Sequence, residues 1–288
     1  MKPAPFDYAA PASLDEALAL KAEHGDAAKF LAGGQSLVPA MNFRLVQAAL
    51  LVDLNRLGEL DYVRVDADGG LRLGAMTRQR RLERDPLIAR HAPLLHAAMP
   101  EVAHPQIRNR GTLGGSLAHA DPAGDPPAAF LALDGSVVVK GPNGERTIPG
   151  TEFFVDILTT ALAEDEIVTG VSFPVLAPGT GTAYVKFEHP ASHYALTGVA
   201  AAVKLDGSGK VESVKVGVTG VGPKAYRATA VEEALVGKDA GAVADAAAHA
   251  ADGIDCNDDI HASAEYRAHL AVVFARRALQ AAFSRAGS

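Results

Sequence analysis

The chain has 288 residues, of which 48% are hydrophobic, and a formal net charge of -7 at pH 7. A chain of this length can bury roughly three-quarters of its unfolded surface and should divide into two or three compact units. Its acidic residues are dispersed and no basic stripe stands out, so the charge gives no reason to expect nucleic acid or a membrane as a partner. No leader-like N-terminus and no apolar run of roughly 20 residues is present, which predicts a cytoplasmic protein without a transmembrane segment.

The first predicted elements are a helix, a strand and a glycine loop. A capping box at Ser13 and Glu16 begins the helix, which should end near Gly25. A short apolar strand over residues 29–31 leads into the run Ala32-Gly33-Gly34-Gln35-Ser36-Leu37. Consecutive glycines allow positive φ and remove Cβ atoms, so successive backbone N–H groups could converge on an anion. Pro39 suits the first turn of a helix, whose dipole again favours negative charge.

The middle of the chain predicts a second compact subdomain. Thr77 and Asp85 are expected to cap short helices, and residues 166–173 should form a strand that closes this unit at Pro174. Other predicted strands are residues 50–54 and two hairpins, made by residues 62–65 with 71–74 and by residues 137–140 with 146–148. A second glycine loop, Gly111-Thr112-Leu113-Gly114-Gly115-Ser116-Leu117, precedes the apolar run 128–133.

The C-terminal part changes character after a segment rich in glycine and proline, residues 175–182. Residues 184–187, 199–205 and 211–219 predict antiparallel strands, and alanine-rich helices should follow. Ser263 is expected to cap the last helix, whose apolar face carries Tyr266, Leu270, Val273 and Phe274. That stripe indicates core packing.

Several other patterns are not expected to form the sites that they resemble. Residues 220–225 fit G-x-G-x-x-A but lack a βαβ continuation, and Pro190 between His189 and His193 favours a loop over a metal site. His119, Asp121 and Asp125 could form a metal cluster, but the adjoining prolines favour a rigid turn that presents a carboxylate to a ligand. The single cysteine, Cys256, excludes an internal disulfide and a cysteine-ligated iron–sulfur cluster within this sequence.

One glycine pair alone is usually an ordinary turn, but the two loops with their flanks are more specific. Together with Pro105-Gln106-Ile107-Arg108-Asn109-Arg110 and the segment 116–127, they resemble the FAD-binding medium subunits of the molybdenum hydroxylases, which include aerobic carbon monoxide dehydrogenase and xanthine dehydrogenase. The likeness covers nearly the whole chain. It implies an α+β fold with two domains. Residues 1–175 would form a flavin fold of the vanillyl-alcohol oxidase or PCMH type, with subdomains of about 1–57 and 58–175. Residues 176–288 would form a smaller α+β domain of the carbon monoxide dehydrogenase flavoprotein type.

The same resemblance implies a set of FAD-binding residues. Those expected around the pyrophosphate are Ala32, Gly33, Gly34, Gln35, Ser36, Leu37, Thr112, Leu113, Gly114, Gly115 and Ser116. Those expected along the rest of the cofactor are Asp125 near the ribityl chain, Ile167 and Val168 at the adenine, and Lys186 and Tyr194 beside the isoalloxazine. Each of the last four residues also has an alternative role. Ile167 and Val168 could be plain core packing, Lys186 a solvated surface lysine and Tyr194 a half-buried strand residue. No catalytic residue and no metal ligand is expected on this chain.

The resemblance further implies a subunit whose partners carry the remaining cofactors. A large partner would hold a molybdopterin-type cofactor and oxidise the substrate, and a small partner would hold two [2Fe–2S] clusters. The expected assembly is a dimer of heterotrimers. This chain would receive electrons on non-covalent FAD and pass them to an external acceptor. Residues 188–193 depart from the family pattern, which leaves the acceptor open. The alternatives are a self-sufficient flavin-dependent oxidoreductase of the same fold and a flavin-free scaffold.

Overall fold

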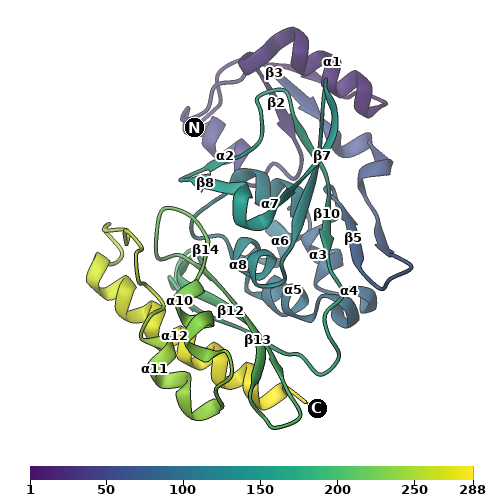
Figure 1. Ribbon diagram of the computed structural model, residues 1–288. Coiled ribbons are helices and arrows are strands. Elements are labelled where there is room, and N and C mark those ends of the chain that lie inside the picture. Colours follow the sequence, from purple (N-terminus) through teal and green to yellow (C-terminus); the bar gives the residue numbers. More distant parts are fainter. Residues whose placement is uncertain (288) are drawn as a thin grey trace.

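The computed structural model describes residues 1–287 and places three sheets of three or more strands in sequence along the chain (Figure 1). The first sheet is parallel, with the order β1-β3-β2 and the bounds β1 Asp7–Ala9, β2 Ala28–Leu31 and β3 Leu50–Asp53. Helix α1 (Leu14–His24) connects β1 to β2, and a short helix α2 (Leu37–Asn42) follows β2. Ser13 Oγ accepts the Glu16 N–H and Gly25 forms the C-cap, so the capping box and the predicted helix end are confirmed.

The second sheet has the strand order β4-β5-β10-β6-β7, and all its pairs are antiparallel. Its strands are β4 Val63–Val65, β5 Leu71–Gly74, β6 Ser136–Gly141, β7 Gly144–Pro149 and β10 Ile167–Phe173. Both predicted hairpins form in it. The helices between β5 and β6 are α3 Gln79–Leu82, α4 Pro86–His91, α5 Pro93–Ala98, α6 Pro105–Arg108, α7 Leu113–His119 and α8 Asp125–Ala132. Between β7 and β10 come α9 Gly150–Phe153 and the small pair β8 Phe154–Asp156 with β9 Thr159–Thr160.

Of the two predicted helix caps in this region, one is confirmed and one is wrong. Asp85 accepts the Leu87 N–H at the start of α4. Thr77 is fully buried and its hydroxyl donates to the Tyr62 carbonyl, while α3 begins after Arg78. A partner distant in sequence has therefore taken the hydroxyl that the local pattern assigned to a cap.

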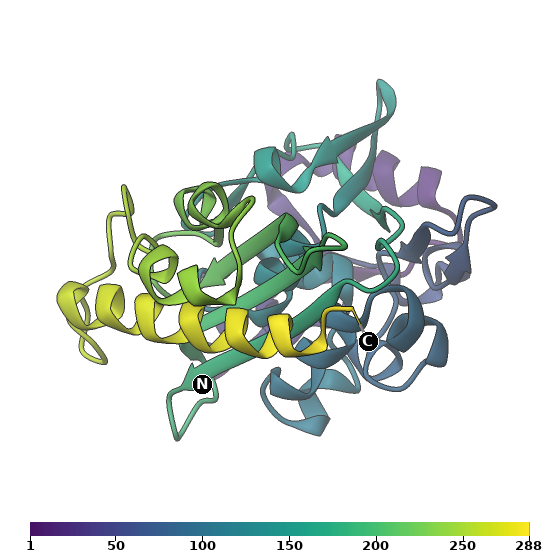
Figure 2. The same ribbon diagram turned by 60° about the horizontal axis from the view of Figure 1, so that its bottom comes forward.

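The third sheet is antiparallel, with β11 Gly181–Glu188, β12 Ala195–Leu205, β13 Val211–Thr219 and β14 Tyr226–Arg227 in that order. Helices α10 Thr229–Leu235, α11 Val243–Ala247 and α12 Ala264–Arg285 follow. Figure 2 shows α12 lying along one face of this sheet. Ser263 caps α12 as predicted. Of the predicted apolar face, Leu270 and Phe274 are buried and Val273 is partly buried, whereas Tyr266 is 43% exposed and lies outside the core. No helix in the described range is both long and apolar enough to cross a membrane.

The third sheet is buried on both faces. Val199, Ala201 and Val203 belong to the core under α12, whereas Ala200 and Ala202 belong to the core around α8. On β13, a Cβ added to Gly217 would lie 2.1 Å from the Ala128 carbonyl oxygen of α8. Small residues thus let the sheet approach α8 closely. The C-terminal strands are held directly against the helix that follows the second glycine loop, so both parts of the chain can contribute to one site.

Candidate functional site

A cavity of about 570 Å³ lies between the two glycine loops, β10 and the segment that joins β11 to β12. The predicted site residues that line it are Ala32, Gly33, Gly34, Gln35, Ser36, Leu37, Thr112, Gly114, Gly115, Ser116, Asp125, Ile167, Val168 and Tyr194. Leu113 and Lys186 are not in the lining. The Leu113 side chain is fully buried in the core, and the Lys186 ammonium donates to the Asp125 carboxylate. Residues far apart in the sequence are therefore brought to one cavity.

The first glycine loop offers free backbone donors. Within residues 1–287, the N–H groups of Gly33, Gly34, Gln35 and Ser36 donate to no protein acceptor. Gly34 has a φ of 73°, which favours glycine, whereas Gly33 is needed for a different reason. A Cβ on Gly33 would lie 2.5 Å from the Arg110 carbonyl oxygen and 2.8 Å from Gly111 Cα. Gly33 thus allows the two loops to touch, and the loop amides suit an anionic oxygen.

The second glycine loop uses its amides inside the protein. The Leu113 N–H donates to the Thr77 carbonyl at 3.0 Å and the Gly114 N–H to the Ala75 carbonyl at 2.9 Å. The next two N–H groups, of Gly115 and Ser116, both donate to Thr112. Carbonyls of the segment after β5 thus pair with the first two of these amides, and Thr112 pairs with the other two.

The second loop packs closely against its neighbours and presents a hydroxyl group to the cavity. Gly114 lacks a positive φ, but a Cβ there would lie 2.5 Å from the Ala75 Cβ. Gly115 lies beside Ala32 of the first loop, 3.5 Å from an added Cβ to the Ala32 Cβ. Ser116 Oγ accepts from Gln79 Nε2 at 2.8 Å, which leaves its own O–H free to donate. The glycines thus bring α7 against its neighbours and up to the cavity.

Gln79 is a lining residue that sequence reasoning missed. It is buried, and its Oε1 has no hydrogen-bond partner among the described residues. Buried polar atoms are rarely left unpaired in proteins, so this oxygen favours a ligand with a donor. The lining thus combines the free amides of the first glycine loop, the unpaired Gln79 Oε1 and the apolar side chains of Leu54, Ile167 and Val168. These groups fit a dinucleotide with a flat ring. No motif marks Gln79 in the sequence.

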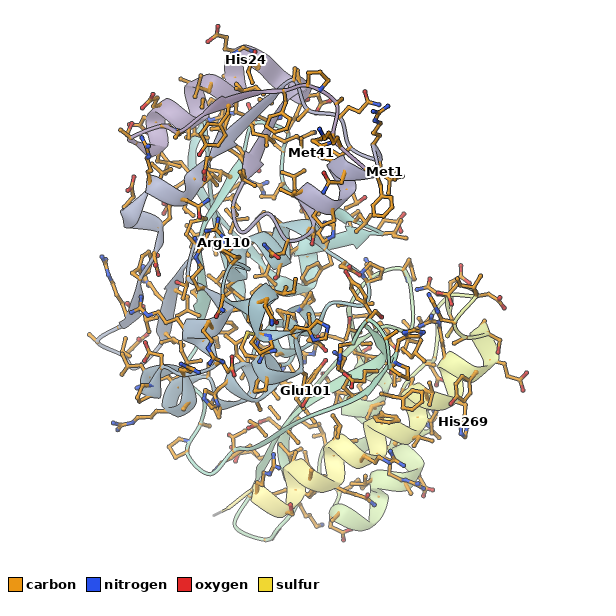
Figure 3. The ribbon with its side chains drawn as sticks, turned by 180° about the vertical axis from the view of Figure 1, so that it is seen from behind. Met1, His24, Met41, Glu101, Arg110 and His269 are labelled. Atoms are coloured by element: carbon orange, nitrogen blue, oxygen red, sulfur yellow. The ribbon has the colours of Figure 1, made fainter. Side chains whose placement is uncertain are left out.

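Asp125 is held by two side chains of the third sheet. Its carboxylate accepts from Tyr184 Oη at 2.5 Å and from Lys186 Nζ at 3.0 Å, and Lys186 also donates to the Glu101 carbonyl at 2.7 Å. Figure 3 shows Glu101 at the junction between the helical part and the C-terminal strands. Sequence reasoning missed Tyr184, although its position two residues before Lys186 on one strand places both on the same face.

Burial raises the pKa of the Asp125 carboxyl to about 6, although the Lys186 charge and the Tyr184 hydrogen bond act against it. Burial, then the Asp125 charge, raises the pKa of Tyr184 well above its ordinary value of 10.0. The phenol therefore stays a donor. Asp125 lines the cavity, so the charge near a bound ligand depends on a cluster that spans both parts of the chain.

The raised pKa of Asp125 predicts a stability that depends on pH. Because the native carboxyl has a pKa of about 6 against 3.8 as its ordinary value, the native state binds the proton more tightly. Its contribution is fully present below pH 3.8 and is lost as the pH rises through about 6; it amounts to about 3 kcal/mol, at about 1.4 kcal/mol per pKa unit. Urea unfolding from pH 4 to 7 should show a flatter pH profile for Asp125→Asn than for the wild type. Asp15→Asn, at an exposed carboxylate, is the control; equal profiles for wild type and Asp125→Asn would contradict the assignment.

Tyr194 and two histidines form the cavity wall on the side of the third sheet. Tyr194 is 51% exposed and lines the cavity. The His193 ring packs edge-on against the His104 ring, with centroids 4.7 Å apart, and His193 Nδ1 lies 2.8 Å from Glu188 Oε2. His189 and His193 lie in the segment between β11 and β12, whereas His104 directly precedes α6. Of the other predicted cluster, His119 Nε2 is 3.9 Å from Asp121 Oδ2, while Asp125 pairs with Lys186.

Two family models match the chain. The one described as FAD binding domain in molybdopterin dehydrogenase matches residues 4–176, and the one described as CO dehydrogenase flavoprotein C-terminal domain matches residues 182–282. The 6-hydroxypseudooxynicotine dehydrogenase complex subunit alpha of Paenarthrobacter nicotinovorans is 41% identical over 288 residues, which cover 99% of this chain and 97% of that one. The carbon monoxide dehydrogenase medium chain of Hydrogenophaga pseudoflava is 38% identical over 287 residues, 99% of each chain.

Solved structures agree with these matches. A chain of carbon monoxide dehydrogenase from Hydrogenophaga pseudoflava superposes with a TM-score of 0.96 and 39% identity over 100% of both chains. A chain of quinoline 2-oxidoreductase from Pseudomonas putida 86 gives a TM-score of 0.92 and 34% identity over 99% of both chains. The expected α+β fold, an FAD-binding domain followed by a C-terminal domain, is confirmed. The chain therefore belongs to the family of FAD-binding medium subunits of the molybdenum hydroxylases.

Proposed function

We propose that this chain binds FAD non-covalently in the 570 Å³ cavity and carries electrons from the [2Fe–2S] clusters of a partner subunit to an external acceptor. The observation that carries the proposal is the run of free amides from Gly33 to Ser36 at one end of a cavity whose other parts are apolar or hold a buried carboxylate. Four free donors suit the pyrophosphate, the group of FAD that bears formal charge. When bound, FAD accepts electrons one at a time and releases them as a pair.

The remaining lining residues suit the other parts of FAD. The apolar side chains of Ile167 and Val168 would hold the adenine, and Gln79 Oε1 is free to accept from a hydroxyl or amino group. Asp125 would accept from ribityl hydroxyls, and the half-exposed Tyr194 ring would lie against the isoalloxazine. Lys186 acts on the ring system through Asp125, because its ammonium already bonds that carboxylate and the Glu101 carbonyl.

The relatives support a role as one subunit among several. Their names describe a dehydrogenase complex subunit and a medium chain, and each aligns with nearly the whole of this chain. We therefore propose a large partner with a molybdopterin-type cofactor, which oxidises the substrate, and a small partner with two [2Fe–2S] clusters, assembled as a dimer of heterotrimers in the cytoplasm. The large partner, a different polypeptide, would recognise the substrate.

Copurification of the tagged chain from its native host tests the whole proposal. We expect a larger and a smaller chain to accompany it, one acid-released FAD per copy, and molybdenum and iron in the same fractions. Native mass determination checks the stoichiometry, and cell fractionation checks the compartment. Flavin without partners but with turnover on alcohols or amines would indicate a self-sufficient oxidoreductase, and partners without flavin would indicate a scaffold.

A further inference from the structure

The first glycine loop is held by a side-chain amide that lies outside the loop. The Gly33 and Gly34 carbonyls accept from groups of the loop itself and of helix α2, at 3.0 and 3.1 Å. The Ala32 carbonyl accepts instead from Asn55 Nδ2 at 3.0 Å, across 23 residues of the chain. Asn55 follows strand β3 and is not in the cavity lining. It therefore contacts the loop from the side away from the cavity.

Asn55 thereby sets the direction of one free donor. The Ala32 carbonyl and the Gly33 N–H belong to one peptide group, which is planar and trans, so the C=O and the N–H point in opposite directions. The Gly33 N–H consequently points away from Asn55, and it donates to no acceptor within residues 1–287. Because Gly33 lines the cavity, this orientation suits a hydrogen bond to a ligand oxygen bound there.

The Asn55 amide is itself fixed by several partners. Its Nδ2 donates to Asp53 Oδ1 as well as to the Ala32 carbonyl, and its Oδ1 accepts from Arg78 Nη2. The Asn55 backbone N–H also donates to Asp53 Oδ1, at 2.8 Å. A flipped amide would place its NH₂ group against the guanidinium donor and its oxygen against two other oxygens. The partners thus hold the amide in one orientation.

Arg78 extends this support to the second glycine loop. Its Nη2 donates to Asn55, while its Nη1 donates to the carbonyl of Arg110 (Figure 3). That carbonyl oxygen is the atom against which Gly33 packs, since a Cβ on Gly33 would lie 2.5 Å from it. The two arms of one guanidinium therefore fix the surroundings of the Gly33 peptide from two sides. A lysine ammonium is a point donor without this fork, so it could not replace both bonds.

We propose that Asn55 and Arg78 are positioning residues for the FAD pyrophosphate, which orient the Gly33 N–H toward it without touching the cofactor. The inference rests on the proposed function, which places FAD in this cavity. Neither side chain is in the lining, so both act through the loop. A different role for Arg78 would be attraction of the anion by charge alone. Lysine distinguishes the two roles, because it keeps the charge but loses the fork.

Titration of the flavin-free full chain with FAD, followed by flavin fluorescence, tests both residues. Asn55→Asp keeps the size and the acceptor for Arg78 but removes the donor to the Ala32 carbonyl, so FAD should bind at least tenfold more weakly. Arg78→Lys and Arg78→Met should each weaken binding at least tenfold as well. The controls are Asn143→Asp, in the exposed turn between β6 and β7, and Arg72→Met, at a side chain that is 61% exposed. Both should bind FAD like the wild type.

Phosphorus NMR of the FAD-saturated proteins separates orientation of the donor from general damage. In Asn55→Asp, a pyrophosphate resonance of bound FAD should shift, because the Gly33 N–H no longer meets that group in the same geometry. The visible absorption bands of the isoalloxazine should not change. A general loosening of the fold would alter both signals, and a residue without influence on the loop would alter neither.

Two results would overturn the inference. Wild-type FAD affinity or unchanged phosphorus resonances in Asn55→Asp would show that Asn55 does not orient the donor. Wild-type affinity in Arg78→Lys, with weak binding in Arg78→Met, would show that Arg78 acts by charge alone. In both cases a wild type that holds one FAD per chain leaves the proposed function standing, whereas a wild type that binds no FAD overturns that function. If Asn55→Asp does not fold, Arg78→Lys still decides the question.

Discussion

Gly33→Val should leave the protein with less than about a tenth of its FAD. A Cβ at this position would lie 2.5 Å from the Arg110 carbonyl oxygen and 2.8 Å from Gly111 Cα, both of which are backbone atoms that cannot rotate away. The two glycine loops would have to separate, and the free amides of the first loop would move away from the rest of the lining. Overpacking of this kind costs roughly 1–3 kcal/mol, and the two methyl groups of valine add further atoms to the clash.

Flavin content per protein, read from the absorption spectrum after gel filtration, measures this effect. Gly114→Val should act similarly, because its Cβ would press on Ala75 Cβ at 2.5 Å and displace α7. Gly207→Val is the matched control, since a Cβ at Gly207 has nothing within 4 Å and its φ is not positive. Stoichiometric FAD in both Gly33→Val and Gly114→Val would show that the cofactor does not lie between these loops.

Lys186→Met should destabilise the protein by about 3–5 kcal/mol, the range measured when one partner of a buried ion pair is removed. The Lys186 and Asp125 side chains are 2% and 5% exposed, so the remaining carboxylate would be buried without its cation. Because the Lys186 charge lowers the pKa of Asp125, its loss should raise that pKa further. The Glu101 carbonyl would lose its donor as well. Urea unfolding at pH 7 measures the change.

A surface pair provides the control for Lys186→Met. Lys140 pairs with Asp15 at 2.7 Å, but these side chains are 35% and 83% exposed. Lys140→Met should therefore cost less than about 1 kcal/mol. The double variant Lys186→Met with Asp125→Asn should recover part of the loss, because it no longer buries an unpaired charge. If Lys186→Met and Lys140→Met destabilise equally, the cluster at Asp125 is not a buried ion pair in solution.

Features set by neighbours within a few residues could be predicted from the sequence alone. The capping box at Ser13, the two hairpins, the Ser263 cap and the strand of residues 166–173 depend on local dihedral preferences and on the alternation of apolar side chains. The two glycine loops carry a family pattern, and most of the residues that the pattern indicated line one cavity.

Which polar groups are free and which are paired depends on packing between distant segments, so it could not be predicted from the sequence. The carbonyls of Ala75 and Thr77 accept hydrogen bonds from amides of the second loop, more than thirty residues later in the chain. The amides of the first loop meet no such acceptor. Tyr184 meets Asp125 across 59 residues, and Arg267 meets Gly220 across 47. Local patterns cannot predict such pairs, because a hydrogen bond depends on which segments the packing brings together. The physical reason is that propensity acts along the chain, whereas desolvation and pairing act through space.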